Sequence, residues 1–157
     1  MKNWTELENS SFFDANARER ALGMVDKGTF TEFLNPLDRY CSPHLPVLGT
    51  AVEFDDGTVC GVGLLGKHPV FVVSMEGKFI GGAIGEVNGG KMVATIRLAL
   101  KAAADIKAKY PEEYAARRPL VAVSFETGGV RLHEANAGLL AHAEVIDAFQ
   151  DCGGIVP

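Results

Sequence analysis

The residues best suited to chemistry are a glycine pair, Gly128 and Gly129, with His133 and Glu134 close behind it. A glycine turn that leads into a helix presents backbone N–H groups, and the aligned peptide dipoles add roughly half a positive charge there. Such a turn can hold an anion or the oxyanion of a reacting carbonyl. We therefore predict that Gly128 and Gly129 form an oxyanion hole, and we consider His133 or Glu134 for proton transfer.

Each of these residues also has a simpler interpretation. Glycine in a tight turn can serve only to avoid a clash with a Cβ atom. Glu134, in the first turn of a helix, can simply complement the helix dipole. The functional interpretation gains weight from a second glycine-rich stretch upstream, residues 76–91, which contains Gly81 and Gly82.

The elements around the first turn follow from the hydrophobic pattern. Residues 120–125 form a short apolar run bounded by Pro119, which predicts a buried strand. Apolar residues then recur at helical spacing from about Val130 to Ile146, which predicts a helix after the turn. A second helix is expected over residues 91–109.

The sequence pattern of the N-terminal half predicts a helix followed by strands. A helix is expected from Asp14, as N-cap, to Val25, and residues 35–49, with three prolines, should be irregular. Residues 51–54 and 59–65 flank Asp55-Asp56-Gly57, a hairpin signal, and residues 70–74 predict a third strand. The whole is an α/β domain over residues 1–157, with an N-terminal helix and irregular segment (1–49) and a ββα core (50–157).

Composition restricts the class of protein. The chain has 157 residues, 47% of them hydrophobic, and a net charge of −5, which does not favour nucleic acid or an anionic membrane as partner. The three cysteines are widely spaced and the histidines form no ligand pattern, so we expect no metal site. Without a signal-peptide core or an apolar run of membrane-spanning length, a cytoplasmic location is expected.

Two glycine patterns resemble nucleotide-binding motifs. Gly61 to Gly66 has G-x-G-x-x-G spacing, but another strand follows where the dinucleotide fingerprint needs a helix. Residues 85–91 (GEVNGGK) have P-loop spacing, although Met92 stands where Mg²⁺ binding needs Ser or Thr. A nucleotide-binding module using Gly85 to Lys91 therefore stays open as a hypothesis from a different class.

Longer stretches carry a family resemblance. The segments GGAIGEVNGGKMVATIRLAL and FETGGVRLHEANAGLLAHAEV resemble the paired signature of the carboxyltransferase family, G-G-S-x-G-E-V-x-G-x-K and S-G-G-A-R-x-Q-E. SFFDANARERALG and NPLDRYCSPHLPVLG are similar, more closely, to β subunits of biotin-independent malonate decarboxylases. The resemblance spans nearly the whole chain from Ser11.

The resemblance implies a crotonase-like (ClpP/crotonase) ββα superhelix, of which this chain would be the N-terminal part. It implies a decarboxylase subunit that works with a γ subunit, an acyl-carrier subunit and an acyl-carrier transferase subunit. The substrate would be a malonyl thioester on the carrier's CoA-like phosphopantetheine arm, with no cofactor bound directly, and the products an acetyl thioester and CO₂. Gly81 and Gly82 would line the pocket, and Arg131 would hold a carboxylate or phosphate or form a structural ion pair.

The departures from the family pattern refine these expectations. Thr127, Val130 and His133 stand where the second signature has Ser, Ala and Gln, which favours a malonate decarboxylase over a biotin-dependent carboxylase. A carboxyltransferase subunit of a biotin-dependent acyl-CoA carboxylase stays as the alternative. Because family members continue beyond Pro157, we expect a fragment or one piece of a cleaved subunit, with apolar surface uncovered on its last helix.

Overall fold

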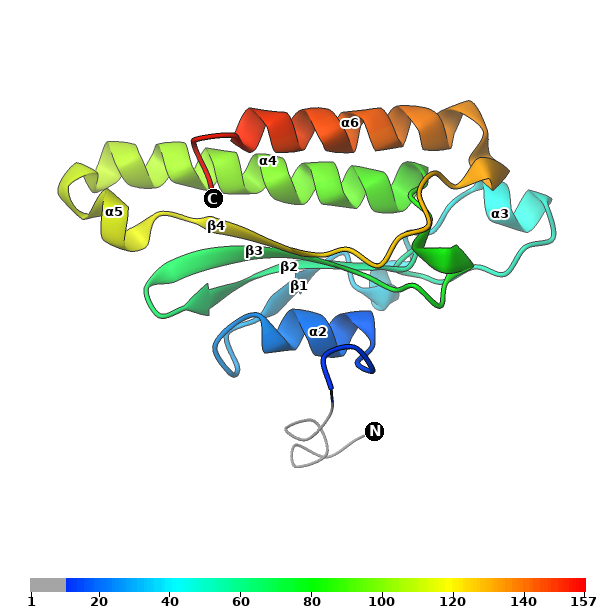
Figure 1. The fold of residues 1–157 in the computed structure, drawn as a ribbon, viewed down its shortest axis with the longest axis horizontal. Helices are drawn as coiled ribbons and strands as arrows, with labels where there is room; N and C mark the ends of the chain where they lie inside the picture. The colour runs from blue at the N-terminus through cyan, green and yellow to red at the C-terminus, as the bar shows by residue number, and fades with distance from the viewer. Residues whose placement is uncertain (1–10) are drawn as a thin grey trace.

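The computed structural model describes residues 11–157 and has three layers (Figure 1). A four-stranded sheet with the order β1-β2-β3-β4 lies in the middle. Helix α2 covers one face, and α4 and α6 lie over the other (Figure 1). The elements are α2 (Ala17–Gly23), β1 (Thr31–Phe33), η1 (Pro36–Asp38), α3 (His44–Val47), β2 (Thr58–Leu65), β3 (His68–Met75), η2 (Ile80–Gly82), α4 (Glu86–Lys109), η3 (Pro111–Glu113), α5 (Tyr114–Arg117), β4 (Leu120–Ser124), η4 (Leu132–Glu134) and α6 (Asn136–Cys152).

The sheet is built around β3. Strand β3 pairs antiparallel with β2 and parallel with β4, and the connection from β3 to β4 passes through α4. Its side chains reach a core on each face: Val73 and Met75 pack toward α4 and α6, whereas Val70 and Val72 pack toward α2. Strands buried on both faces read as continuous apolar runs, which is the pattern of residues 70–75. The ββα order is that of the predicted α/β crotonase-like fold.

Local predictions around the sheet were partly wrong. Residues 51–54 form no strand, so no hairpin forms at Asp55–Gly57; the turn at Gly66, which the sequence also indicates, joins β2 to β3. The Asp-Gly signal failed because the Asp56 side chain is buried and accepts hydrogen bonds from distant elements, so this turn serves tertiary contacts. The first helix is shorter than predicted, and its N-cap is Asn16 in a capping box with Glu19, not Asp14.

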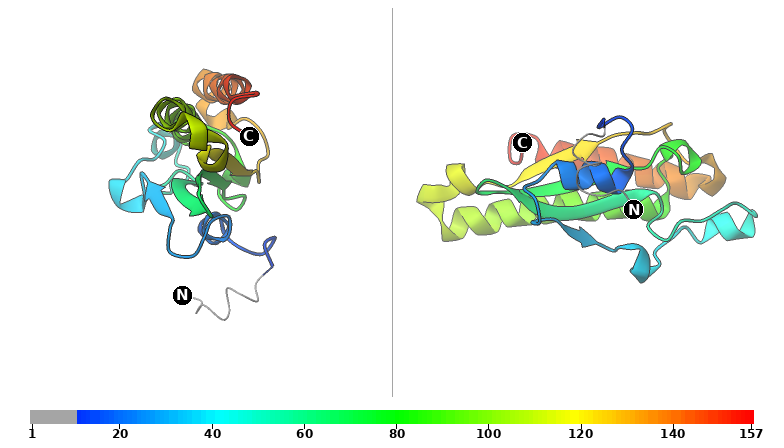
Figure 2. Two further views of the ribbon diagram at one scale, coloured as in Figure 1. Left: turned by 90° about the vertical axis from the view of Figure 1, so that its left-hand side faces the viewer. Right: turned by 90° about the horizontal axis from the view of Figure 1, so that it is seen from below.

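The helices after the glycine-rich stretches also begin elsewhere than predicted. Helix α4 begins at Glu86, so it already contains Gly89 and Gly90. Helix α6 begins only at Asn136, because the short η4 turn precedes it and Ala135 adopts a left-handed φ of 47° between the two. Both helices start at the same end of the molecule, beside α3, η2 and η4 (Figures 1 and 2).

Helix α6 carries uncovered apolar side chains. Leu139 is 54% exposed, Leu140 67% and Ile146 48%. Strand β4 lies at an edge of the sheet, and all five of its residues are half-buried. The predicted uncovered apolar surface on the last helix is therefore present in this chain.

Within residues 11–157, no helix is both long and apolar enough to cross a membrane. The first ten residues, on which the expected absence of a signal peptide rested, lie outside the described residues.

Candidate functional site

The two glycine turns meet, although about 45 residues of chain separate them. The Gly128 N–H group donates to the Gly81 carbonyl at 2.7 Å. Next to it, Ile84 and Val130 form a single parallel bridge: the Ile84 N–H donates to the Gly129 carbonyl at 2.7 Å, and the Arg131 N–H donates to the Ile84 carbonyl at 2.8 Å. Three backbone hydrogen bonds therefore fix the two turns against each other.

Two backbone segments approach so closely at the first turn that only glycine fits there. Gly82 has φ of 66°, and a Cβ atom there would lie 1.7 Å from the Glu126 carbonyl oxygen. Gly81 also has a left-handed φ, 62°. Glu126 is held in turn by the buried Arg20 side chain of α2 and by the Gly77 N–H group. The helix beneath the sheet thus helps to position the end of β4, where the second turn begins.

The N–H groups of the second turn are not equally available to a ligand. The Gly128 N–H is used in the bond to Gly81, so the prediction of Gly128 as an oxyanion donor does not fit this geometry. The Gly129 N–H donates to the Thr127 hydroxyl at 3.0 Å, a side chain on the exposed part of the turn that can rotate away. The Val130 N–H has no partner among residues 11–157. Gly129 and Val130 are therefore the successive donors that this turn can offer.

Arg131 is a structural residue, contrary to the predicted substrate contact. Its side chain is 1% exposed, and Nη1 lies 2.9 and 2.8 Å from the two carboxylate oxygens of Asp56 and 3.0 Å from Glu134 Oε1. The guanidinium also lies over the Phe79 ring, 5.4 Å from its centroid. Enclosed by these groups, it cannot reach a ligand, so the alternative of a structural ion pair is the one observed.

Asp56 connects this ion pair to two more segments. Its carboxylate accepts the N–H of Ser42 at 3.2 Å and the N–H of Asn88, in the first turn of α4, at 3.1 Å. Burial raises the pKa of Asp56, while Arg131 and the two N–H groups oppose this shift. We refer to Ser42, Asp56, Arg131 and Glu134 as the buried network.

Glu134 caps a helix and is not placed for proton transfer. Its Oε2 accepts the Glu86 N–H, the first of α4, at 2.6 Å, and its side chain is also hydrogen-bonded to Ser42 and Arg131. Burial by itself would raise the pKa of Glu134, but these hydrogen bonds outweigh it and lower the pKa below its ordinary value of 4.5. A carboxylate kept ionised and saturated with donors cannot supply a proton, so the alternative role at a helix N-terminus is the observed one.

This lowered pKa predicts an acid-dependent contribution of Glu134 to stability. A carboxyl whose pKa is lower in the folded state stabilises the fold above its unfolded pKa, and the contribution is lost as the pH falls through the folded pKa. The free energies of unfolding of the wild type and of Glu134→Gln, measured with urea, should therefore differ most near pH 7, and the difference should begin to shrink only as the pH falls below about 4.5. A difference independent of pH would contradict an ionised cap.

A pair that the sequence did not suggest lies at the same end of α4. His44 Nε2, from α3, is 3.0 Å from Glu86 Oε2, with both side chains about half exposed. His133, the predicted candidate, is exposed on η4 and has no partner among the described residues. No spacing rule links residues 44 and 86, so only the packing of α3 beside α4 reveals this pair.

The structure argues against the nucleotide-binding hypothesis. Residues 86–91 form the first turns of α4 instead of a phosphate loop, and Lys91 is 4% exposed. The Lys91 ammonium donates to the carbonyl oxygens of Asp55, at 2.8 Å, and Thr58, at 2.5 Å, and burial lowers its pKa. This lysine stabilises the turn before β2 and cannot reach a phosphate.

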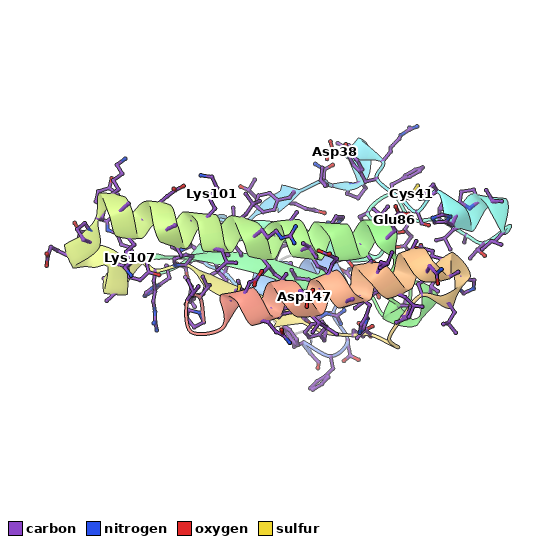
Figure 3. The ribbon with its side chains drawn as sticks, turned by 90° about the horizontal axis from the view of Figure 1, so that it is seen from above. Asp38, Cys41, Glu86, Lys101, Lys107 and Asp147 are labelled. Atoms are coloured by element: carbon purple, nitrogen blue, oxygen red, sulfur yellow. The ribbon has the colours of Figure 1, made fainter. Side chains whose placement is uncertain are left out.

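A hollow of about 340 Å³ lies between the N-terminal half of α4 and the facing side of α6. Gly89 and Ala141 allow the two helices to approach closely, and a Cβ on Gly89 would lie 2.9 Å from that of Ala141. Glu86 lines the hollow at the start of α4 (Figure 3). Gly89 of the P-loop-like segment thus has a role in helix packing.

The known proteins that this chain resembles are carboxyltransferases, carboxylases and malonate decarboxylases. The chain is 60% identical over 157 residues to the malonyl-S-ACP:biotin-protein carboxyltransferase MADC of Malonomonas rubra, covering 100% of this chain and 49% of that protein. It is 30% identical over 143 residues to the propionyl-CoA carboxylase beta chain of Saccharopolyspora erythraea, covering 90% of this chain and 23% of that one. The crystal structure of a Pseudomonas malonate decarboxylase hetero-tetramer in complex with malonate matches with a TM-score of 0.81 and 37% identity, over 98% of this chain and 52% of that chain. No family model matches.

The sheet, its covering helices and the joined glycine turns define a crotonase-like domain of the kind found in carboxyltransferases. Over its full length the chain is related to carboxyltransferases and to subunits of malonate decarboxylase. It spans about half the length of the Malonomonas and Pseudomonas relatives. The predicted family and fold are confirmed. Independence from biotin stays a prediction, because the name of the Malonomonas relative refers to a biotin protein.

Proposed function

We propose that this chain takes part in removing the carboxyl group from a malonyl thioester through an enolate intermediate. The observation that carries the proposal is the pair of bridged glycine turns in a chain 60% identical to an enzyme named for malonyl-S-ACP. The substrate would arrive on the phosphopantetheine arm of an acyl-carrier subunit, and no other cofactor would be bound by this chain.

The chemistry suits backbone donors at the second turn. Breaking the bond to the carboxyl group moves electrons into the thioester carbonyl, so negative charge develops on its oxygen. The N–H groups of Gly129 and Val130 would hold that oxygen, and they would bind it more strongly in the transition state than in the substrate. The buried network would hold this turn rigid, because Arg131 follows Val130 directly. Fixed donors need no reorganisation when the charge appears.

Two fates of the carboxyl group are supported by different relatives. The name of the Malonomonas protein describes transfer to a biotin protein, and at 60% identity this is the fate we favour. The Pseudomonas structures, 37% and 34% identical, are malonate decarboxylases, and they support direct release of CO₂ as the second candidate. Both fates share the enolate and the acetyl thioester product, so the glycine turns would act in the same way.

A partner subunit is part of the proposal. The two Pseudomonas structures are a hetero-tetramer and a hetero-dimer of malonate decarboxylase subunits. The apolar side chains exposed on α6, Leu139 and Leu140 among them, would be covered by such a partner, for which the γ subunit is the candidate. The acyl-carrier and acyl-carrier transferase subunits would complete the assembly.

The experiment follows carboxyl-labelled malonyl thioester with the chain alone, with a co-expressed partner, and with a biotinylated carrier protein added. We expect turnover only with the partner, and label on biotin if transfer is the fate. Label released as CO₂ without biotin would support the second candidate. Turnover by the isolated chain at the assembled rate would contradict partner dependence, and thermal stabilisation by ATP·Mg²⁺ but not by malonyl-CoA would contradict the proposed substrate.

A further inference from the structure

The His44–Glu86 pair lies beside the glycine turns and has the form of an acid–base couple. Glu86 follows Ile84 by two residues, and Ile84 is hydrogen-bonded to Gly129. Figure 3 shows Glu86 at the beginning of α4, near the segment that carries Cys41. His44 is 43% exposed and Glu86 53%, so a ligand can approach the imidazole. A carboxylate on one ring nitrogen orients the imidazole and leaves the other nitrogen, Nδ1, for proton transfer.

The buried network fixes both members of the pair through their backbones. The His44 N–H donates to the Ser42 hydroxyl at 3.2 Å, and the Glu86 N–H donates to Glu134 at 2.6 Å. Ser42 and Glu134 are themselves at most 4% exposed. An ordinary surface ion pair has two mobile side chains on independent elements. Here one network of buried charges anchors the starts of α3 and α4 together.

The other charged groups near His44 do not compete for this role. Arg131 and Glu134 bind each other, and Arg131 also binds Asp56, all within the buried network. His133 on η4, the element packed against α3, has no partner to orient it among the described residues. Within residues 11–157, His44 is the one histidine paired with a carboxylate.

We infer that His44, oriented by Glu86, delivers the proton that converts the enolate into the acetyl thioester. The inference rests on the proposed function. In this step the enolate carbon takes a proton from the His44 imidazolium, a C–H bond forms, the N–H bond breaks, and the neutral imidazole is protonated again by water. Glu86 is a positioning residue, because it acts on the imidazole and not on the substrate.

The reverse of this step provides the test. In D₂O, an enzyme that makes the enolate from an acetyl thioester exchanges the methyl hydrogens for deuterium, without a carboxyl group being involved. Mass spectrometry of acetyl-CoA incubated with the assembled enzyme measures this exchange, and labelled malonyl-CoA measures carboxyl loss. His44→Gln should lower the exchange rate by about 10²-fold or more, in line with the contribution of general acid–base groups, and lose the imidazole limb of the pH–rate profile.

The matched control is His68→Gln, a histidine at the opposite end of β3 from the glycine turns, which should keep exchange and carboxyl loss within twofold. Glu86→Gln keeps a hydrogen-bonding side chain but not the charge. We therefore expect a smaller decrease in the exchange rate and a change in its pH dependence. Normal exchange and an unchanged pH profile in His44→Gln would overturn the inference while leaving the proposed function intact. A wild-type enzyme that catalyses neither reaction would overturn the proposed function, and the inference with it.

Discussion

Replacing Gly129 by valine is expected to lower kcat by about a hundredfold or more. Loss of one oxyanion donor typically reduces kcat by about 10²–10³. A Cβ atom at Gly129 would meet no protein atom within 4 Å, so the valine side chain would enter open space at the turn and not clash with the protein. Its φ of 103° is also one that valine resists, so the turn would rotate its N–H away from the reacting oxygen.

The matched control for this variant is Gly66→Val. Gly66 also has a left-handed φ, 62°, and open space at the Cβ position, but it lies in the β2–β3 turn, at the opposite end of β3 from the glycine turns. Backbone strain alone should destabilise both variants by roughly 1–3 kcal/mol. Only Gly129→Val should lose turnover per folded molecule, with a much smaller change in KM. A destabilised Gly129→Val enzyme with normal kcat would end the oxyanion proposal.

Replacing Arg131 by methionine is expected to lower the free energy of unfolding by about 3–5 kcal/mol, because it leaves buried carboxylates without their partner. Asp56 is fully buried and Glu134 is 4% exposed, so water cannot replace the guanidinium. The change should also loosen the second glycine turn, since Arg131 is next to Val130. Urea unfolding at pH 7 measures the effect.

Arg97→Met provides the comparison for Arg131. It breaks the Arg97–Glu144 ion pair, whose side chains are 59% and 57% exposed, and such a pair contributes about 0–1 kcal/mol. Arg131→Met should be several times more destabilising than Arg97→Met. If the two variants were equally stable while Arg131→Met raised KM for the thioester, the substrate contact predicted from the sequence would be correct after all.

The errors at the candidate site share one physical cause. Glu134 was considered for proton transfer because it follows the glycine pair, and the family resemblance left Arg131 as either a substrate contact or a structural ion pair. Their actual partners, Asp56 and the Glu86 N–H, come from elements 48 to 75 residues away. A residue's sequence neighbours do not reveal whether its side chain is buried against a distant segment. For the same reason His44 was missed, since nothing near it in sequence indicates Glu86.

The sequence by itself determined the features that depend on local order and composition: the strands over 59–65, 70–74 and 120–124, the long helix ending at Lys109, and the two glycine turns with their family signature. Burial of the last of these strands was wrongly expected, because β4 is only half-buried. Periodicity and glycine placement act within a few residues, so they can be read along the chain. Tertiary structure alone decided which N–H groups stay free, because the bond from Gly128 to Gly81 joins turns far apart in sequence. It also decided that Arg131 is structural and that His44 meets Glu86, because burial and ion pairing depend on which elements pack together.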